Sequence, residues 1–318
     1  TVLEGIRRRF GADRVAYAEG CRISEGEAGA TEWWSDDVYQ SDPAEQQERI
    51  AAAAALAEQS DVVILVIGGN EATAREGWAK DHQGDRASLA LPGEQVALVT
   101  AVSATGTPTV AVVMGGRPLD LNPVVERCGA VLQVWYLGQE GGDAIAAIIA
   151  GDANPSGKLP VTIPGDVGKL PYTYRDRPSK RRGYLFAPTE PLFPFGHGLS
   201  YTEFSYDTIV LDPAVISPDE STLVSVEVSN VGEHAGIEVV QCYVRDRVAS
   251  VTRPLQSLCG FAPIHLEPGE TKTASFTIGP AALGLLDRNM RHVVERGKFE
   301  IRIGGSSAEC VSAELAVR

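Results

Sequence analysis

Long apolar runs and a surplus of basic residues are both missing from this sequence of 318 residues. No stretch of about 18 apolar residues occurs, so the sequence predicts no membrane-spanning helix. The 42 acidic residues outnumber the 28 lysines and arginines, and a net charge of -14 repels phosphate backbones. We therefore expect neither a membrane nor a nucleic acid as a partner.

Cysteine and histidine are scarce, with five of each, and their spacing matches no metal-binding or redox motif. No C-x-x-C pair and no H-E-x-x-H run is present, which argues against a zinc site. The glycine-rich stretches 115–118 and 138–142 lack the spacing of phosphate-binding loops. We expect reduced thiols, no metal and no cofactor.

The first residues show neither an initiating methionine nor the apolar core of a signal peptide. Leu3, Ile6 and Phe10 would share one face of a helix, which is typical of the middle of a domain. We expect the chain to be part of a processed or cut protein. This leaves the compartment open between the cytoplasm and the periplasm or cell exterior.

Residues 1–165 alternate helix and strand patterns, which favours a mostly parallel sheet with helices on both faces. Continuous apolar runs predict buried strands at 62–67, 109–114 and 130–136. Helix patterns cover 44–60, 93–105 and 143–150. The sequence therefore predicts an α/β sandwich domain over residues 1–165, incomplete at its N-terminus.

The remainder of the chain shows two further sequence patterns. Residues 166–204 are rich in proline, which predicts an extended connector. From residue 205 the apolar residues alternate with polar ones, as in Val224, Val226 and Val228, with turn signals between the runs. Residues 205–318 are thus predicted to form an all-β sandwich of roughly seven strands.

The segment 68–95 carries the most chemistry, because it leaves the end of the predicted strand 62–67 as a long charged loop. It holds two carboxylates, Glu71 and Glu76, then Trp78, and then the pair Asp85 and Arg86. Loops at the carboxyl ends of parallel strands are where open α/β sheets bind ligands. We expect the functional site in this segment.

An ordered set of motifs spread over most of the chain resembles glycoside hydrolase family 3, in its C-terminal half. Besides 68–95, the matching stretches are T-V-L-E-G (1–5), V-A-Y-A-E-G-C (15–21), 135–142, G-D-A-N-P-S-G-K-L-P-V-T (151–162), R-G-Y-L-F (182–186), P-L-F-P-F-G-H-G-L-S-Y-T (191–202) and E-V-V-Q (238–241). Each motif is weak alone, but the ordered set is specific.

The resemblance implies that complete members have a barrel, an α/β sandwich and a fibronectin type III-like domain. This chain would hold most of the second and all of the third, while the nucleophilic aspartate would lie on the missing barrel. Glu76 would be the general acid/base, although an insertion separates it from Asp85 and Arg86, where relatives often show E-G-x-D-R. The implied function is a retaining exo-β-glycosidase, foremost a β-glucosidase, acting on a β-glucoside or oligosaccharide.

Other interpretations of the same residues stay open. Glu71 competes with Glu76 for the acid/base role. The plainer interpretation of Glu76 is a solvated loop charge, and that of Glu71 is a cap or an ion pair with Arg75 or Arg86. Trp78 suits stacking on a sugar or anchoring the loop, and Asp85 and Arg86 suit an ion pair that holds it.

Two more carboxylate groupings have plainer explanations. Glu94 suits the start of a helix, where a negative charge is favourable. The Ser-Asp at Asp36, beside Trp33 and Trp34, mimics a nucleophile motif but follows no apolar strand. The alternative functions are a β-xylosidase of the same family, or a non-catalytic carbohydrate-binding or assembly module. The expected partner is the barrel segment, as a separate chain or a cleaved piece.

Overall fold

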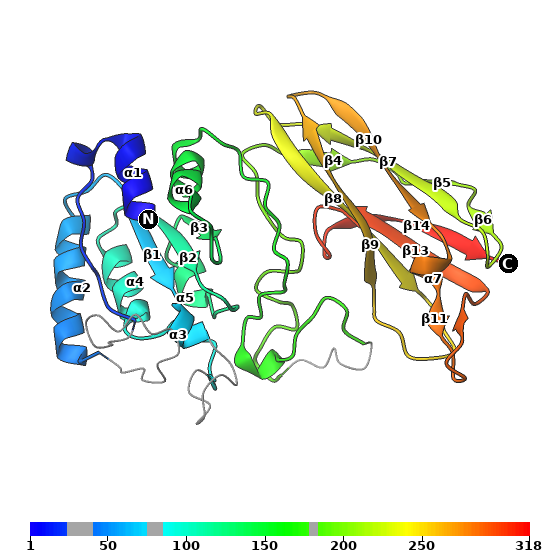
Figure 1. The fold of residues 1–318 in the computed structure, drawn as a ribbon, viewed down its shortest axis with the longest axis horizontal. Helices are drawn as coiled ribbons and strands as arrows, with labels where there is room; N and C mark the ends of the chain where they lie inside the picture. Colours follow the sequence, from blue (N-terminus) through cyan, green and yellow to red (C-terminus); the bar gives the residue numbers. More distant parts are fainter. Residues whose placement is uncertain (24–40, 75–84, 178–183) are drawn as a thin grey trace. The chain divides into compact units, whose positions relative to one another are not determined.

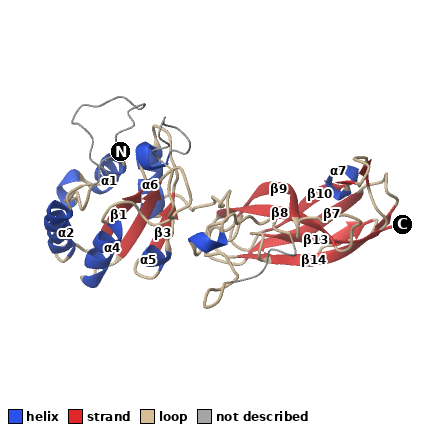
Figure 2. Cartoon of the chain, turned by 90° about the horizontal axis from the view of Figure 1, so that it is seen from below, coloured by secondary structure: helices blue, strands red, loops and turns tan. Residues whose placement is uncertain are grey.

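The fold of this computed structural model is described for residues 1–23, 41–74, 85–177 and 184–318 (Figure 1). The chain divides into two compact units. The first unit contains residues 1–152 and 164–167, and the second contains residues 153–163 and 168–318. Helices belong mainly to the first unit and strands to the second (Figure 2).

The first unit is built on a parallel sheet of three strands in the order β1-β2-β3. They are β1 (Val63–Gly68), β2 (Thr109–Met114) and β3 (Ala130–Gln133). The middle strand is fully covered, because Ala111, Val112 and Val113 have at most 1% of their surface exposed. Burial on both faces explains the continuous apolar run that predicted this middle strand.

Helices flank this sheet, as the alternating pattern predicted. The bounds are α1 (Val2–Phe10), α2 (Pro43–Ala57), α3 (Glu71–Ala74), α4 (Gln95–Ala104), α5 (Asn122–Val125) and α6 (Gly141–Ala150). Helix α1 packs against α6, and α2 packs against α4. Among the described residues, no helix is long and apolar enough to cross a membrane.

The third strand ends earlier than the predicted range 130–136. Strand β3 stops at Gln133, and Trp135 takes a positive φ of 52°, which bulky residues rarely adopt. The prediction was wrong here because apolar character continues through Trp135 and Tyr136 while the backbone already turns.

The second unit is a β-sandwich, as the two-residue period predicted. One sheet has the order β10-β7-β4, with β5 also on β7, and the other has the order β6-β14-β13-β8-β9. The bounds are β4 (Phe204–Tyr206), β5 (Val210–Asp212), β6 (Val215–Ile216), β7 (Thr222–Asn230), β8 (Gly236–Asp246), β9 (Ser257–Leu266), β10 (Thr271–Ile278), α7 (Pro280–Leu283), β11 (Leu285–Leu286), β12 (His292–Val293), β13 (Gly297–Gly304) and β14 (Cys310–Val317).

The core of this sandwich comes from alternate residues of its long strands. Val224, Val226 and Val228 of β7 are at most 2% exposed, and Phe299, Ile301 and Ile303 of β13 at most 1%. The short strands β4, β5, β6, β11 and β12 raise the number of described strands above the roughly seven expected. Two or three residues are too few for a periodic pattern to predict.

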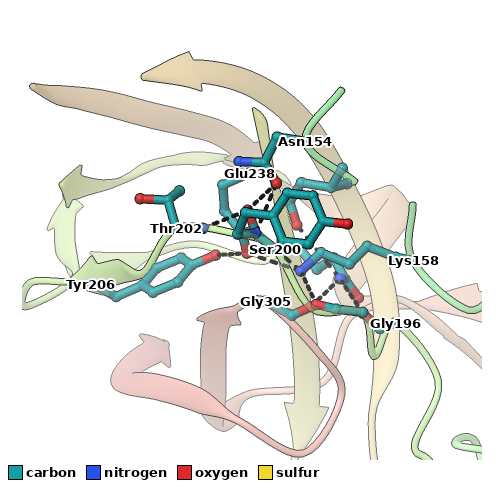
Figure 3. A network of polar contacts seen from close by, with 12 residues as sticks. Asn154, Lys158, Gly196, Ser200, Thr202, Tyr206, Glu238 and Gly305 are labelled. Atoms are coloured by element: carbon teal, nitrogen blue, oxygen red, sulfur yellow. Dashed lines mark hydrogen bonds and ion pairs between the residues drawn. The ribbon is translucent and has the colours of Figure 1, made fainter. Parts of the chain in front are cut away.

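Residues before β4, both in 153–163 and in the proline-rich stretch, are fixed to the β-sandwich by polar contacts (Figure 3). Glu238 on β8 is 4% exposed, lies 3.2 Å from Nζ of Lys158 and accepts a hydrogen bond of 2.7 Å from the hydroxyl of Tyr206. Asn154 donates to the carbonyl of Ala235 and accepts from the hydroxyl of Ser200. Residues 153–163 therefore fold with the β-rich unit.

A second buried side chain, Gln241 on β8, also holds residues before β4 against the β-sandwich. Its Nε2 donates to the carbonyl oxygens of Gly196 and Gly305, at 3.1 and 2.6 Å. Its Oε1 accepts from the hydroxyl of Tyr243, which is itself fully buried. One strand thus holds a loop of the proline-rich stretch and the end of β13 at once.

Candidate active site

The candidate site begins where β1 ends, at Gly68. This residue has φ of 130°, and a Cβ built there would lie 1.7 Å from the carbonyl oxygen of Met114. Only glycine fits such a position, because a side chain would separate β1 from β2. The next amide, that of Gly69, donates to the same Met114 carbonyl at 2.8 Å.

Gln95 joins the two ends of the segment 68–95. This first residue of α4 is 2% exposed, and its Oε1 accepts from the amide of Gly68 at 2.6 Å. Its Nε2 donates to the carbonyl oxygens of Gly68 and Pro92, both at 2.7 Å. The loop therefore leaves and re-enters the sheet region at one fixed point.

The outgoing side of the loop starts with the short helix α3. Asn70 accepts a hydrogen bond of 3.0 Å from the amide of Thr73, and the hydroxyl of Thr73 accepts one of 3.1 Å from the amide of Asn70. This reciprocal pair acts as an N-cap. Glu71 is exposed at the first position of α3, close to the end of β1.

The returning side of the loop is held by backbone acceptors. Nη2 of Arg86 donates to the carbonyl of Ala90 at 2.5 Å, and the amide of Asp120 donates to the carbonyl of Leu89 at 2.6 Å. Burial lowers the pKa of Arg86, and the nearby guanidinium of Arg117 lowers it further. Asp85, next to Arg86, is exposed.

Tyr136 is a site residue that the sequence did not reveal. It follows β3 directly and is 52% exposed, and burial of the rest of the side chain raises the pKa of its hydroxyl. The charge of Glu71 raises this pKa as well, while the amide of Gly116 and the charge of Arg117 lower it. Groups that follow all three strands thus act on one phenol at the carboxyl edge of the sheet.

A hollow of about 230 Å³ opens beside the end of β1. Its lining includes Gly68, Gly69, Gln95 and Tyr136, together with Glu19 and Cys21. Burial, and then the charges of Glu94 and Glu19, raise the pKa of Cys21 to about 11, so this thiol stays protonated at neutral pH. Ligand pockets commonly measure about 300–1,000 Å³, so the described residues form a small hollow by comparison.

Several predicted site residues lie outside the described part of the chain. Glu76 and Trp78 fall within 75–84, and Trp33, Trp34 and Asp36 fall within 24–40. The structure brings Glu71, Arg86, Arg117 and Tyr136 into one neighbourhood. Among the residues with described positions, no group of three or more His, Cys, Asp or Glu side chains is placed to hold a metal ion.

Comparison with known proteins gives matches for both units. Residues 1–201 match the C-terminal domain of glycosyl hydrolase family 3, and residues 238–307 match a fibronectin type III-like domain. A β-xylosidase of Formosa agariphila is 43% identical over 312 residues, which cover 96% of this chain and 40% of that protein. A periplasmic β-glucosidase of Salmonella typhimurium is 38% identical over 322 residues, which cover 97% of this chain and 41% of that protein.

Solved structures agree with these matches. A β-glucosidase of Erythrobacter marinus shares 42% identity at a TM-score of 0.95, over all of this chain and 43% of its own. A β-glucosidase of Listeria innocua in complex with glucose gives 32% identity and a TM-score of 0.78, over 85% of this chain and 38% of its own. The chain spans about two fifths of the length of its curated relatives. With its first 201 residues matched to the C-terminal domain of glycoside hydrolase family 3, the chain belongs to that family.

Proposed function

We propose that this chain supplies the general acid/base of a retaining exo-β-glycosidase, and that this residue is Glu76. The observation that carries the proposal is the closure of the loop by Gln95, which ties Gly68 to Pro92. A proton donor must be held close to the leaving oxygen that it protonates, since misplacement by about 1 Å can cost about 100-fold in rate. A loop whose two ends are tied together, at Gly68 and at Pro92, suits that role better than a loop with free ends.

The second carboxylate of the reaction is proposed to come from the barrel segment that the family resemblance implies. A retaining glycosidase needs its two carboxyl groups about 5–5.5 Å apart, one to attack the anomeric carbon and one to protonate the leaving oxygen. Glu76 would then take a proton from water in the second step. Trp78, two residues further, would stack on the sugar of the leaving group.

The substrate proposed is a non-reducing terminal β-glucoside, with a β-xyloside as the second candidate. The relative of Formosa agariphila with 43% identity is named a β-xylosidase, whereas the relative of Salmonella typhimurium is named a β-glucosidase. The two sugars differ by one hydroxymethyl group, a contact worth about 1–3 kcal/mol. The ratio of kcat/KM for 4-nitrophenyl β-glucoside and β-xyloside decides between them.

The acid/base assignment is tested with Glu76→Gln and Glu76→Ala in the complete enzyme, with Glu71→Gln as the matched control. We expect kcat to fall by about 100- to 10,000-fold on substrates with poor leaving groups, and much less on activated aryl glycosides. Azide should restore turnover to the Ala variant by replacing the water that needs a base. If Glu71→Gln shows this pattern instead, the acid/base is Glu71.

The role of the barrel is tested with the purified 318-residue chain. Without a nucleophile on the opposite side of the anomeric carbon, the chain should not hydrolyse 4-nitrophenyl β-glucoside, and adding the barrel segment should restore hydrolysis. Turnover by the chain alone that disappears in Asp36→Asn would place the nucleophile within this chain. A chain that binds sugars but stays inactive with the barrel would be a carbohydrate-binding or assembly module.

A further inference from the structure

Two cysteines meet inside the β-sandwich, on the neighbouring strands β8 and β9. Cys242 is fully buried in the core, and Cys259 is half-buried and packs against the same core. Their Sγ atoms lie 3.6 Å apart, and both thiols are free. The sulfurs are therefore in contact without a bond between them.

An irregularity in the pairing of β8 and β9 causes this contact. Cys242 pairs with Gly260, while the next residue, Tyr243, pairs with Leu258. Cys259 is thus the extra residue of a β-bulge, which re-aims its side chain. Its Sγ lies 3.2 Å from the carbonyl oxygen of Cys242, so the thiol points back across the strand pair.

The spacing of such strands suits a disulfide. Neighbouring strands lie about 4.7–4.9 Å apart. Cys259 is next in the chain to Gly260, the residue that pairs with Cys242. Disulfides join Cα atoms that are about 4.4–6.8 Å apart, with an S–S distance of about 2.0 Å. The two sulfurs must approach by about 1.6 Å, and the bulged residue has no directly opposed partner to hold it in place.

The remaining thiol of the β-sandwich is too far away to compete. Cys310 lies on β14, and β13 separates that strand from β8. Two strand spacings amount to about 9–10 Å. The thiol of Cys310 instead donates to the carbonyl of Ser306 at 3.1 Å. It therefore serves as an internal control.

We propose that Cys242 and Cys259 form a cross-strand disulfide by exchange with a small disulfide oxidant or a disulfide-carrying oxidoreductase. The half-buried Cys259 thiolate attacks a sulfur of the oxidant, and one oxidant thiol leaves. Cys242 then gives up its proton and attacks the Cys259 sulfur, which releases the second oxidant thiol. Two protein thiols and one oxidant disulfide become one protein disulfide and two free thiols.

The surroundings of the two cysteines set the order of these steps. The hydrogen-bonding contact with Cys259, and then burial, raise the pKa of Cys242 well above that of an ordinary cysteine. A thiol that ionises so reluctantly is a poor first nucleophile. Cys259 is therefore the point of entry, and the attack by Cys242 is the slow step.

The test uses the full chain, incubated with oxidised glutathione, unfolded, alkylated and mapped by mass spectrometry without reduction. We expect a cross-linked peptide in which neither Cys242 nor Cys259 is alkylated, with a mass two hydrogen atoms below the sum of the two unmodified peptides. Dithiothreitol should reverse both changes. Cys310→Ser should form the same cross-link, whereas Cys259→Ser should not. In Cys242→Ala, Cys259 should stop at the glutathione mixed disulfide.

The mapping of the unmutated chain decides the matter even if a variant fails to fold. Cys242 and Cys259 both found alkylated after oxidation would overturn the proposal. A cross-link from Cys259 to Cys310 would overturn it as well, since β13 would then have to be displaced.

Discussion

Gln95 is a residue whose importance comes from three backbone partners and not from any chemistry of its own. Its amide group binds the N–H and C=O of Gly68 and the C=O of Pro92, all near a buried strand end. An unmade hydrogen bond at a buried group costs more than a made one contributes. The side chain therefore contributes to stability and to loop position together.

We expect Gln95→Leu to lower the free energy of unfolding by at least about 3 kcal/mol, because it leaves three backbone groups unpaired and each such group, when buried, costs about 1–3 kcal/mol. Urea titration followed by circular dichroism measures this loss. Gln59→Leu is the control, because Gln59 is exposed and its side chain donates to the carbonyl of Ala55, within its own helix end. Equal losses in both variants would contradict the role assigned to Gln95.

His197 predicts a pH dependence of stability in the β-rich unit. Burial lowers the pKa of its imidazole, Lys158 lowers it further, and Glu309 raises it. The folded state thus binds a proton less readily than the unfolded state does. The stabilisation is present above about pH 6.5, the usual histidine pKa, and is lost as the pH falls through the lowered value.

The melting temperature should therefore fall more steeply between pH 7.5 and pH 5.5 in the unmutated chain than in His197→Gln. His265→Gln is the matched control, because the side chain of His265 is 54% exposed. Parallel curves for the chain and for His197→Gln would remove His197 as the cause.

Among the elements, the pairing of β1 with β2 depends on Gly68. A methyl group there would lie 1.7 Å from the Met114 carbonyl, and φ is 130°. Gly68→Ala should lower the free energy of unfolding by about 2–6 kcal/mol, the sum of overpacking and backbone strain. Gly138→Ala is the control, because a Cβ at Gly138 meets nothing within 4 Å. A loss in Gly68→Ala no larger than in the control would contradict this account.

The sequence predicts the long strands well, but it does not predict every strand end or the shortest strands. The strands at 63–68 and 109–114 follow from continuous apolar runs, and the alternation in β7 and β13 follows from one buried face. The end of β3 does not follow, because the positive φ of Trp135 leaves no trace in hydrophobicity. Strands of two or three residues, such as β6 and β11, are not predicted, because they are too short to show a periodic pattern.

The candidate site also contains residues that the sequence indicates and residues that it does not. The segment 68–95 stands out in the sequence, because a long charged loop follows the predicted strand 62–67. The part played by Gln95 stayed hidden, because it depends on a contact across 27 positions of the chain. Tyr136 does not stand out in the sequence, because its ring extends an apolar run and so predicts one more strand residue.

At the scale of the whole molecule, the β-rich unit begins well before its first strand. Lys158 and Gly196 bind buried side chains of β8, and Asn154 binds the carbonyl of Ala235, just before β8. All three residues precede β4. A fragment of residues 205–318 would leave Glu238 buried without its cation. Breaking a buried ion pair in this way costs about 3–5 kcal/mol.

We therefore expect a fragment of residues 153–318 to be monomeric and to melt cooperatively, and the fragment 205–318 to melt at a lower temperature or to aggregate. Differential scanning calorimetry and gel filtration distinguish these outcomes. Adding Glu238→Gln to the shorter fragment should recover part of the loss. Equal melting temperatures for both fragments would show that residues 153–204 do not support the sandwich.

The course of the chain between the two units also limits how genes of this family can recombine. The backbone passes into the second unit at Ala153, returns to the first for residues 164–167, and passes out again at Gly168. Residues 164–167 are held in the first unit by Asn122, whose Nδ2 donates to the carbonyl of Gly165 at 2.8 Å. A single genetic crossover between codons 153 and 167 would separate residues 153–163 or 164–167 from part of the unit to which they belong. The two units are therefore expected to be inherited together, and to diverge as a pair, rather than to spread as separate modules.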